Sequence, residues 1–94
     1  MARAILKYEL EVKGVQKVKV KKGSRVLSVH VQDGKPYIWI MVNDKAKEEE
    51  DSPLEVLVIP TDQPIDAKID VNKYKFVGTC HSLEGKFVIH VFVR

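Results

Sequence analysis

The chain has 94 residues, of which 45% are hydrophobic and 31% charged, so it fits one small globular domain and not a disordered chain. Its net charge of +3 is low for a dedicated nucleic-acid-binding domain. No apolar run reaches the roughly 18 residues of a membrane-spanning helix, and the start MARAILKYEL lacks the pattern of a signal peptide. The single cysteine, Cys80, excludes an internal disulfide. We therefore expect one domain over residues 1–94, in a reducing cytoplasm and without a membrane partner.

The first quarter of the chain has a hydrophobic period of two. Residues 4–12 alternate apolar with mostly charged side chains, which predicts a half-buried strand. Lys13-Gly14 predicts a two-residue turn, after which residues 15–22 return as the second arm of a hairpin. This arm and the residues after it carry the basic side chains of the region, namely Lys17, Lys19, Lys21, Lys22 and Arg25. Such lysines could follow a phosphate backbone, but on an edge strand they also prevent aggregation through the edge.

The strongest local signal is the hairpin around Asp33-Gly34, the dipeptide preferred in type I′ turns. If these two residues form the turn, Gln32 faces Lys35 and the pairing of the two arms follows. The predicted opposed pairs are Val31–Pro36, His30–Tyr37, Val29–Ile38, Ser28–Trp39, Leu27–Ile40 and Val26–Met41.

The two faces of this hairpin differ in composition. One face is aliphatic and is the predicted core side, with Leu27, Val29, Val31, Ile38 and Ile40. The other face is mixed and aromatic, with Val26, Ser28, His30, Tyr37, Trp39 and Met41. Aromatic walls with a few polar groups are typical of a binding surface, although a second packed face would have the same composition.

The middle of the chain is less regular. Residues 44–53 are acidic and end at Pro53, which predicts a mobile loop. Residues 54–59 read as a strand that Pro60 stops. Residues 61–72 fit either a loosely formed strand or a long ordered loop.

The C-terminal region predicts a second hairpin, with its turn at Glu84-Gly85. In this register Ser82 faces Phe87, Cys80 faces Ile89, Thr79 faces His90, Gly78 faces Val91 and Val77 faces Phe92. The last segment, FVIHVFVR, is apolar on both faces, so we expect a central strand in which His90 and Thr79 form a hydrogen-bonded polar pair. With no helical periodicity, the chain predicts an all-β fold: a small antiparallel sandwich or barrel of six to seven strands built from hairpins.

The sequence offers little for catalysis. Cys80 and His81 are neighbours, but neighbours on a strand point to opposite faces and cannot share a proton. Nucleotide-binding and hydrolase motifs are absent, and the histidines are too scattered to predict a metal centre. We therefore expect a protein that is not an enzyme and has no catalytic residues, metal or cofactor.

Several short motifs resemble a family of short, uncharacterised phage and prophage proteins. They are Lys7-Tyr8, Gly14 with Gln16, Leu27-Ser28-Val29, Trp39, Gly78-Thr79 and His90-Val91-Phe92. The acidic 44–53 and the 61–72 segments lie outside this likeness. The resemblance implies a phage-encoded protein in the bacterial host cytoplasm and supplies no activity.

Three functions remain in view. The first is a binding protein that sequesters or blocks a host protein or a small, anionic, nucleotide-like ligand, in host takeover or counter-defence. Its predicted contacts are Trp39, Tyr37, His30, Ser28, Met41 and Arg25. The second is a single-stranded nucleic-acid-binding barrel that uses Lys17, Lys19, Lys21 and Lys22, and the third is a structural component of a virion. In each case the apolar terminal strands favour a homo-oligomer.

Overall fold

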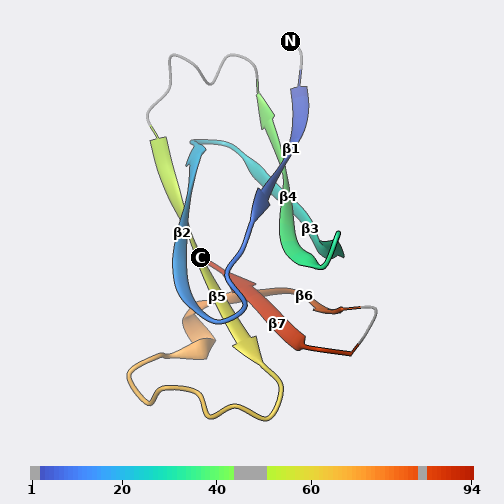
Figure 1. Ribbon diagram of the computed structural model, residues 1–94. Helices are drawn as coiled ribbons and strands as arrows, with labels where there is room; N and C mark the ends of the chain where they lie inside the picture. Colours follow the sequence, from blue (N-terminus) through green and yellow to red (C-terminus); the bar gives the residue numbers. More distant parts are fainter. Residues whose placement is uncertain (1–2, 44–50, 83–84) are drawn as a thin grey trace.

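The computed structural model describes residues 3–43, 51–82 and 85–94 and confirms the predicted antiparallel β-sandwich (Figure 1). Seven strands are present in this part of the chain, with one turn of 3-10 helix at Val71–Lys73. The strands are β1 (Arg3–Glu9), β2 (Gly14–Lys21), β3 (Arg25–Gln32), β4 (Lys35–Asn43), β5 (Asp51–Pro60), β6 (Lys75–His81) and β7 (Val88–Val93). No helix in the described ranges is long and apolar enough to cross a membrane.

The strands form two sheets, one of three strands in the order β1-β4-β3 and one of four in the order β2-β5-β7-β6. Because successive side chains on a strand alternate between faces, each sheet has one inner and one outer face. The inner faces enclose the core, which consists of Leu10, Val18, Val20, Val29, Ile38, Ile40, Val56, Val58, Cys80, Ile89, Val91 and Val93.

The predicted first hairpin is wrong in its pairing. Gly14 adopts a positive φ of 97°, as a turn glycine can, but β1 pairs with β4 and β2 pairs with β5. The side chain of Gln16 closes the connecting loop instead, since it bonds both the N–H and the carbonyl of Glu11. The two arms therefore enter different sheets; Val18 and Val20 of β2 are buried in the core, whereas Leu6 of β1 remains 44% exposed.

The two predicted later hairpins have the right register near their turns and the wrong one further away. Pairing from Gln32–Lys35 to Ser28–Trp39 is confirmed, and so are the pairs from Cys80–Ile89 to Gly78–Val91. A β-bulge then shifts each ladder. Leu27 is the extra residue of the first bulge and is exposed, so Val26 pairs with Ile40 and packs against the core in its place. In the second bulge Phe76, not Val77, faces Phe92.

Strand β5 is longer than predicted and begins at Asp51, so residues 51–53 are not part of a loop. At Pro53 the strand β5 is paired on one side only, with β2, because its pairing with β7 begins at Val56. A proline, which has no N–H to donate, is tolerated where one side of a strand is unpaired. The rest of the predicted acidic loop, residues 44–50, lies outside the described residues. Prolonged pairing on both sides makes β5 the long central strand that Figure 1 shows.

The C-terminal strand is interior, as its composition predicts. Strand β7 pairs with β5 on one side and β6 on the other, and Ile89 and Val91 are fully buried. Thr79 Oγ1 and His90 Nδ1 lie 2.9 Å apart, which confirms the polar pair.

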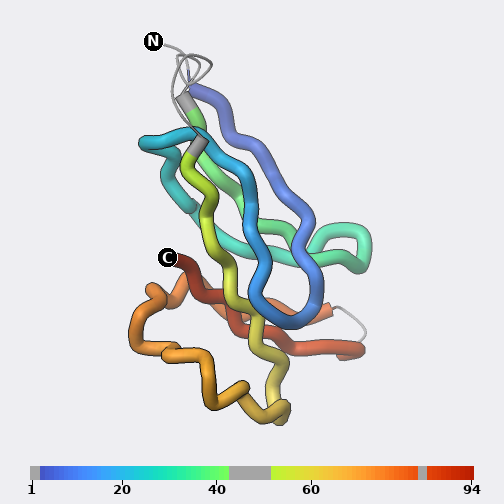
Figure 2. Tube along the Cα trace, turned by 90° about the vertical axis from the view of Figure 1, so that its left-hand side faces the viewer, coloured from blue at the N-terminus to red at the C-terminus, as the bar shows by residue number. Residues whose placement is uncertain are grey.

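Residues 61–74 do not form a strand. This segment, which we call the strap, runs from the end of β5 to the start of β6 as a wide loop that both views show (Figures 1 and 2). Its internal turns are held by Asp66 and Asp70, whose side chains accept hydrogen bonds from the backbone of Lys68 and Asn72. The strap residues Gln63, Ile65 and Ile69 lie close to the outer face of the four-stranded sheet, where they line a pocket with Leu57.

Candidate functional site

The predicted binding residues do meet on one surface, the outer face of the three-stranded sheet. Trp39 on β4 faces Ser28 on β3 and Lys7 on β1, and the next row along contains Tyr37 opposite His30. Met41 and Arg25 pair in the row on the other side of Trp39. Val26 was predicted on the same face of the hairpin, but the bulge turns it toward the core. We call this surface the Trp39 face.

The aromatic side chains of the Trp39 face contact one another at their edges. The Trp39 ring centroid lies 5.8 Å from that of His30 and 5.9 Å from that of Tyr37, with both pairs T-shaped. The ammonium group of Lys7 lies 4.7 Å from the Tyr37 ring centroid and donates a 2.6 Å hydrogen bond to Gln32 Oε1. These contacts hold the rings in place, so the face is organised before any partner arrives.

Charge on the Trp39 face is mostly positive. The strand register places four cationic side chains on it. Among the described side chains, Glu9 is the one carboxylate of this face, and its Oε1 atom lies 3.8 Å from Lys35 Nζ. The cations are Arg3, Lys7, Arg25 and Lys35. Ile5, 58% exposed, stands in the Met41 row. The face therefore combines aromatic, apolar and cationic groups on one surface that the solvent reaches.

The Trp39 face is open and nearly flat. A shallow hollow beside Trp39 is lined by Ser28, His30, Val31 and Gln32. A second small hollow holds Arg25 with Arg3 and Met41. Small-molecule sites enclose most of their ligand in roughly 300–1,000 Å³. The hollow beside Trp39 is too open for this, and the hollow at Arg25, with about 160 Å³, is too small.

The lysines predicted as phosphate contacts lie elsewhere. Lys17, Lys19 and Lys21 project from β2, an edge strand of the four-stranded sheet, so they do not share the Trp39 face. Lys22 follows in the turn after β2. A single strand of nucleic acid stacked on Trp39 would not follow these lysines at the same time, and their edge position fits protection of that edge.

The nucleophilic side chains of the C-terminal hairpin do not form a catalytic arrangement. Cys80 is buried in the core, where burial raises the pKa of its thiol, and His81 is exposed on the opposite face of the strand. Ser82 Oγ accepts hydrogen bonds from the backbone N–H groups of Lys86 and Phe87, so it holds a turn. The described residues contain no group of three or more side chains that could hold a metal ion.

The outer face of the four-stranded sheet carries a second site that the sequence analysis did not identify. An apolar row crosses all four strands, because Val15 pairs with Leu57, Leu57 with Phe92, and Phe92 with Phe76. Leu57 is 1% exposed although it points away from the core between the sheets. The strap covers it.

One end of the strap is anchored beside this row by His90. The Nδ1 atom of His90 lies 2.9 Å from Thr79 Oγ1, and its Nε2 atom lies 2.7 Å from Thr61 Oγ1. A hydroxyl both donates and accepts, so the two threonines can satisfy either neutral tautomer of the ring. The backbone N–H of Thr61 also donates to the carbonyl of Val88 at 2.9 Å.

The other end of the strap is anchored at Glu55. Tyr74 Oη donates a hydrogen bond to Glu55 Oε2, and Arg94 Nε donates to the same oxygen at 2.7 Å. The bond from Tyr74 lowers the pKa of Glu55; burial opposes this, and the bond and charge of Arg94 lower it further. The bond to Glu55 and burial raise the pKa of Tyr74, and the Arg94 guanidinium lies 4.9 Å from the Tyr74 ring centroid.

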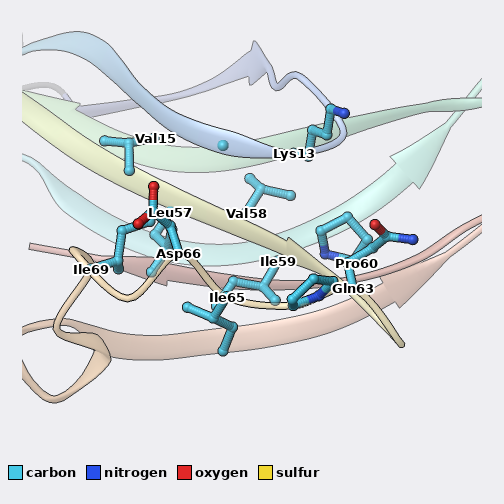
Figure 3. Close-up of a pocket in the computed structure, with 12 residues that line it drawn as sticks. Lys13, Val15, Leu57, Val58, Ile59, Pro60, Gln63, Ile65, Asp66 and Ile69 are labelled. Carbon is cyan, nitrogen blue, oxygen red and sulfur yellow. The ribbon is translucent and has the colours of Figure 1, made fainter.

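A pocket of about 640 Å³ lies between the anchored strap and the sheet (Figure 3). Its walls are mostly aliphatic and include Val15, Leu57, Ile59, Ile65 and Ile69. Lys13 lies above Gln63 in the right half of the view, and Asp66 lies in the left half. The alternating Ile65, Ala67, Ile69 and Val71 made the segment resemble a strand, whereas Pro64 and the turn-forming Asp66 and Asp70 were the signals for a folded loop.

Comparison with known proteins gives a family and no activity. The model of a family described as Domain of unknown function (DUF7352) matches residues 1–94, so the chain belongs to that family. No curated protein and no solved structure matches the chain.

Proposed function

We propose that this member of the family is a binding protein without catalytic activity, and that it docks on an acidic protein surface through the Trp39 face. The observation that carries the proposal is the aromatic cluster on an outer sheet face, in which His30 is exposed and Trp39 and Tyr37 are half-buried against each other and their neighbours. Protein interfaces are enriched in tryptophan, tyrosine, methionine and arginine, and the residues that dominate their binding energy come from the same set.

Shape favours a protein over a small ligand at this site. A flat sheet face can cover a broad partner surface, whereas the hollow beside Trp39 is too open, and the hollow at Arg25, with about 160 Å³, too small, to enclose a nucleotide-like molecule. Packing of the rings against one another lowers the entropy lost when the surface is immobilised in a complex.

Charge indicates what kind of protein would fit. Four cations surround the aromatic cluster, against the single carboxylate of Glu9 among the described side chains. Acidic groups on the partner would speed its association with the Trp39 face, and the cations of this face would repel a basic protein surface. A single-stranded nucleic acid is also anionic and could stack on Trp39, so the experiment must separate the two.

The resemblance to phage proteins extends the proposal to a setting. In an infected bacterium, a small protein with such a face would bind a host protein and block it, as a device of host takeover or counter-defence. A structural role in a virion would use the same face for assembly with other copies or other chains.

The test is affinity capture from bacterial lysate with three forms of the protein: wild type, Trp39→Ala and Phe76→Ala. Phe76 is the matched control, an exposed aromatic residue on the outer face of the other sheet. We expect an acidic protein that is retained by wild type and Phe76→Ala, lost from Trp39→Ala, and released as the salt concentration rises.

Two further treatments decide the outcome. Nuclease digestion of the lysate should leave the capture unchanged, and loss of the captured material would favour a nucleic acid. The captured protein, once purified, should bind wild type with a Kd that Trp39→Ala raises at least about thirtyfold, the 2 kcal/mol expected of a dominant interface residue. Equal binding by wild type and Trp39→Ala would contradict the proposal.

A further inference from the structure

We infer that the pocket beneath the strap is a second binding site, and that it takes a small molecule with an apolar body and a single acidic group, such as a medium-chain fatty acid. The inference does not depend on the function proposed for the Trp39 face, which lies on the other sheet.

The pocket has the size and walls of a ligand site. Its volume of about 640 Å³ falls within the range of roughly 300–1,000 Å³ that is typical of small-molecule pockets. Leu57 and Ile59 form its floor on β5, and Ile65 and Ile69 face them from the strap. Val15 and Ile65 are each 47% exposed despite lining the pocket, so apolar surface remains for a ligand to cover.

The strap gives the pocket a fixed roof. The His90–Thr61 contact holds one end of the strap to the sheet, and the Tyr74–Glu55 bond holds the other. Both anchors use side chains of the same outer sheet face that forms the floor. A ligand would therefore enter a site that is already formed, and little binding energy would be lost in ordering the loop.

One end of the pocket is suited to an acidic group. Lys13 and Gln63 both line this end of the pocket, and neither side chain has a hydrogen-bond or ion-pair partner among the described residues. The ammonium group of Lys13 and the amide of Gln63 are both donors, as a carboxylate requires.

The other end disfavours a second acidic group. Asp66 lies there beside Ile69, and its Oδ1 atom accepts the backbone N–H of Lys68, which fixes the carboxylate in place. A dicarboxylate that spans the pocket would bring its second negative charge toward Asp66. The arrangement therefore selects a monoacid.

The experiment compares four ten-carbon ligands at submicellar concentration: decanoate, decanol, decylamine and decanedioate. Binding is followed by the NMR chemical shifts of the methyl groups, using labelled Leu, Ile and Val. We expect decanoate to shift Leu57, Ile65 and Ile69, and to bind more tightly than the other three. Shifts confined to the Trp39 face, or equal affinity for decylamine and decanoate, would overturn the inference.

Two variants test the two halves of the site. Lys13→Gln should weaken the binding of decanoate by about two- to fivefold, the contribution of a solvent-exposed ion pair, and leave the affinity for decanol unchanged. Lys75→Gln, an equal change on β6 outside the pocket, is its control. Ile65→Glu should weaken decanoate by about tenfold or more, because it adds a charge to an apolar wall. Ile65 is half exposed, so this variant should still fold, and undiminished decanoate binding to it would also overturn the inference.

The two sites can fail separately. Trp39→Ala should bind decanoate with unchanged affinity, while Ile65→Glu should capture the same protein from lysate as the wild type. Loss of decanoate binding in Trp39→Ala would place the ligand on the wrong sheet.

Discussion

The two outer faces of this sandwich present a contrast. The face of the four-stranded sheet is covered by the chain itself, with the strap anchored at His90 and at Glu55 above the buried Leu57. The Trp39 face has no such cover among the described residues, although it carries the single tryptophan of the chain. On the four-stranded sheet the strap buries Leu57 and leaves only the pocket open, whereas the Trp39 face is left open across its whole width and is available to a larger partner.

The largest expected effect separates core from face on a single strand. Ile40 and Trp39 are neighbours on β4, but Ile40 is fully buried between the sheets and Trp39 lies on the outer face. Ile40→Ala should lower the free energy of unfolding by about 2–5 kcal/mol, as deletion of core side chains does. Trp39→Ala should lower it by about 1 kcal/mol, the value of its aromatic edge contacts.

Urea unfolding measures both variants of β4. If Trp39→Ala destabilised the protein as much as Ile40→Ala, Trp39 would be part of the packed structure, and the Trp39 face would not be a surface left open for a partner. If Trp39→Ala lost the captured partner and kept most of its stability, the role of this face in binding would be supported.

A smaller effect is expected from release of the strap. His90→Phe keeps a ring of similar size on β7 and removes the bonds to Thr61 and Thr79. Because a hydrogen bond contributes about 0.5–1.5 kcal/mol net, we expect a loss of about 1–2 kcal/mol. Amide hydrogen exchange should accelerate at Thr61, whose N–H donates to Val88.

The control for this variant is His30→Phe on the Trp39 face, which makes an aromatic contact with Trp39 and does not touch the strap. It should leave exchange at Thr61 unchanged. Equal acceleration in both variants would show that the strap responds to global stability and that His90 is not its anchor.

The sequence predicted what depends on local geometry. Asp33-Gly34 determines the register of its hairpin as far as Ser28 and Trp39, because a two-residue turn fixes which residues are opposed. The same reasoning placed Thr79 opposite His90, and the apolar composition of both faces identified β7 as a central strand. It also assembled most of the Trp39 face, since residues opposite one another on a strand pair share a face.

The sequence did not predict what depends on distant contacts. No residue type marks the bulge at Leu27. The bulge at Val77 stands next to Gly78, and a glycine inside a strand is a signal for a bulge or a close approach, here to Val29 of the other sheet. The turn near Gly14 showed that the chain reverses but not that β1 and β2 join different sheets. The pocket was missed for the same reason, because residues of β2, β5 and the strap meet there after the chain has folded.

The smallest expected effect is a pH dependence confined to the covered face. Because the pKa of Glu55 is lowered in the folded protein, the unfolded chain binds more protons in mildly acidic solution. The stability that Glu55 contributes is therefore present above its ordinary pKa of 4.5 and is lost as the pH falls through the lower folded value. The pKa of Tyr74 is raised from 10.0, so its contribution is present below pH 10 and is lost as the pH rises through the folded value.

Glu55→Gln should therefore destabilise the protein most near neutral pH, and its difference from wild type should shrink toward both acid and alkali. Tyr74→Phe removes the hydrogen-bond donor and leaves the Glu55 carboxylate, which keeps its bond from Arg94. This variant should therefore raise the pKa of Glu55 toward its ordinary value and reduce the loss of stability as the pH falls. Urea unfolding at a series of pH values measures both variants. A constant difference from wild type across the series would mean that the carboxylate and phenol do not act through their ionisation, and that packing of the Tyr74 ring alone holds this end of the strap.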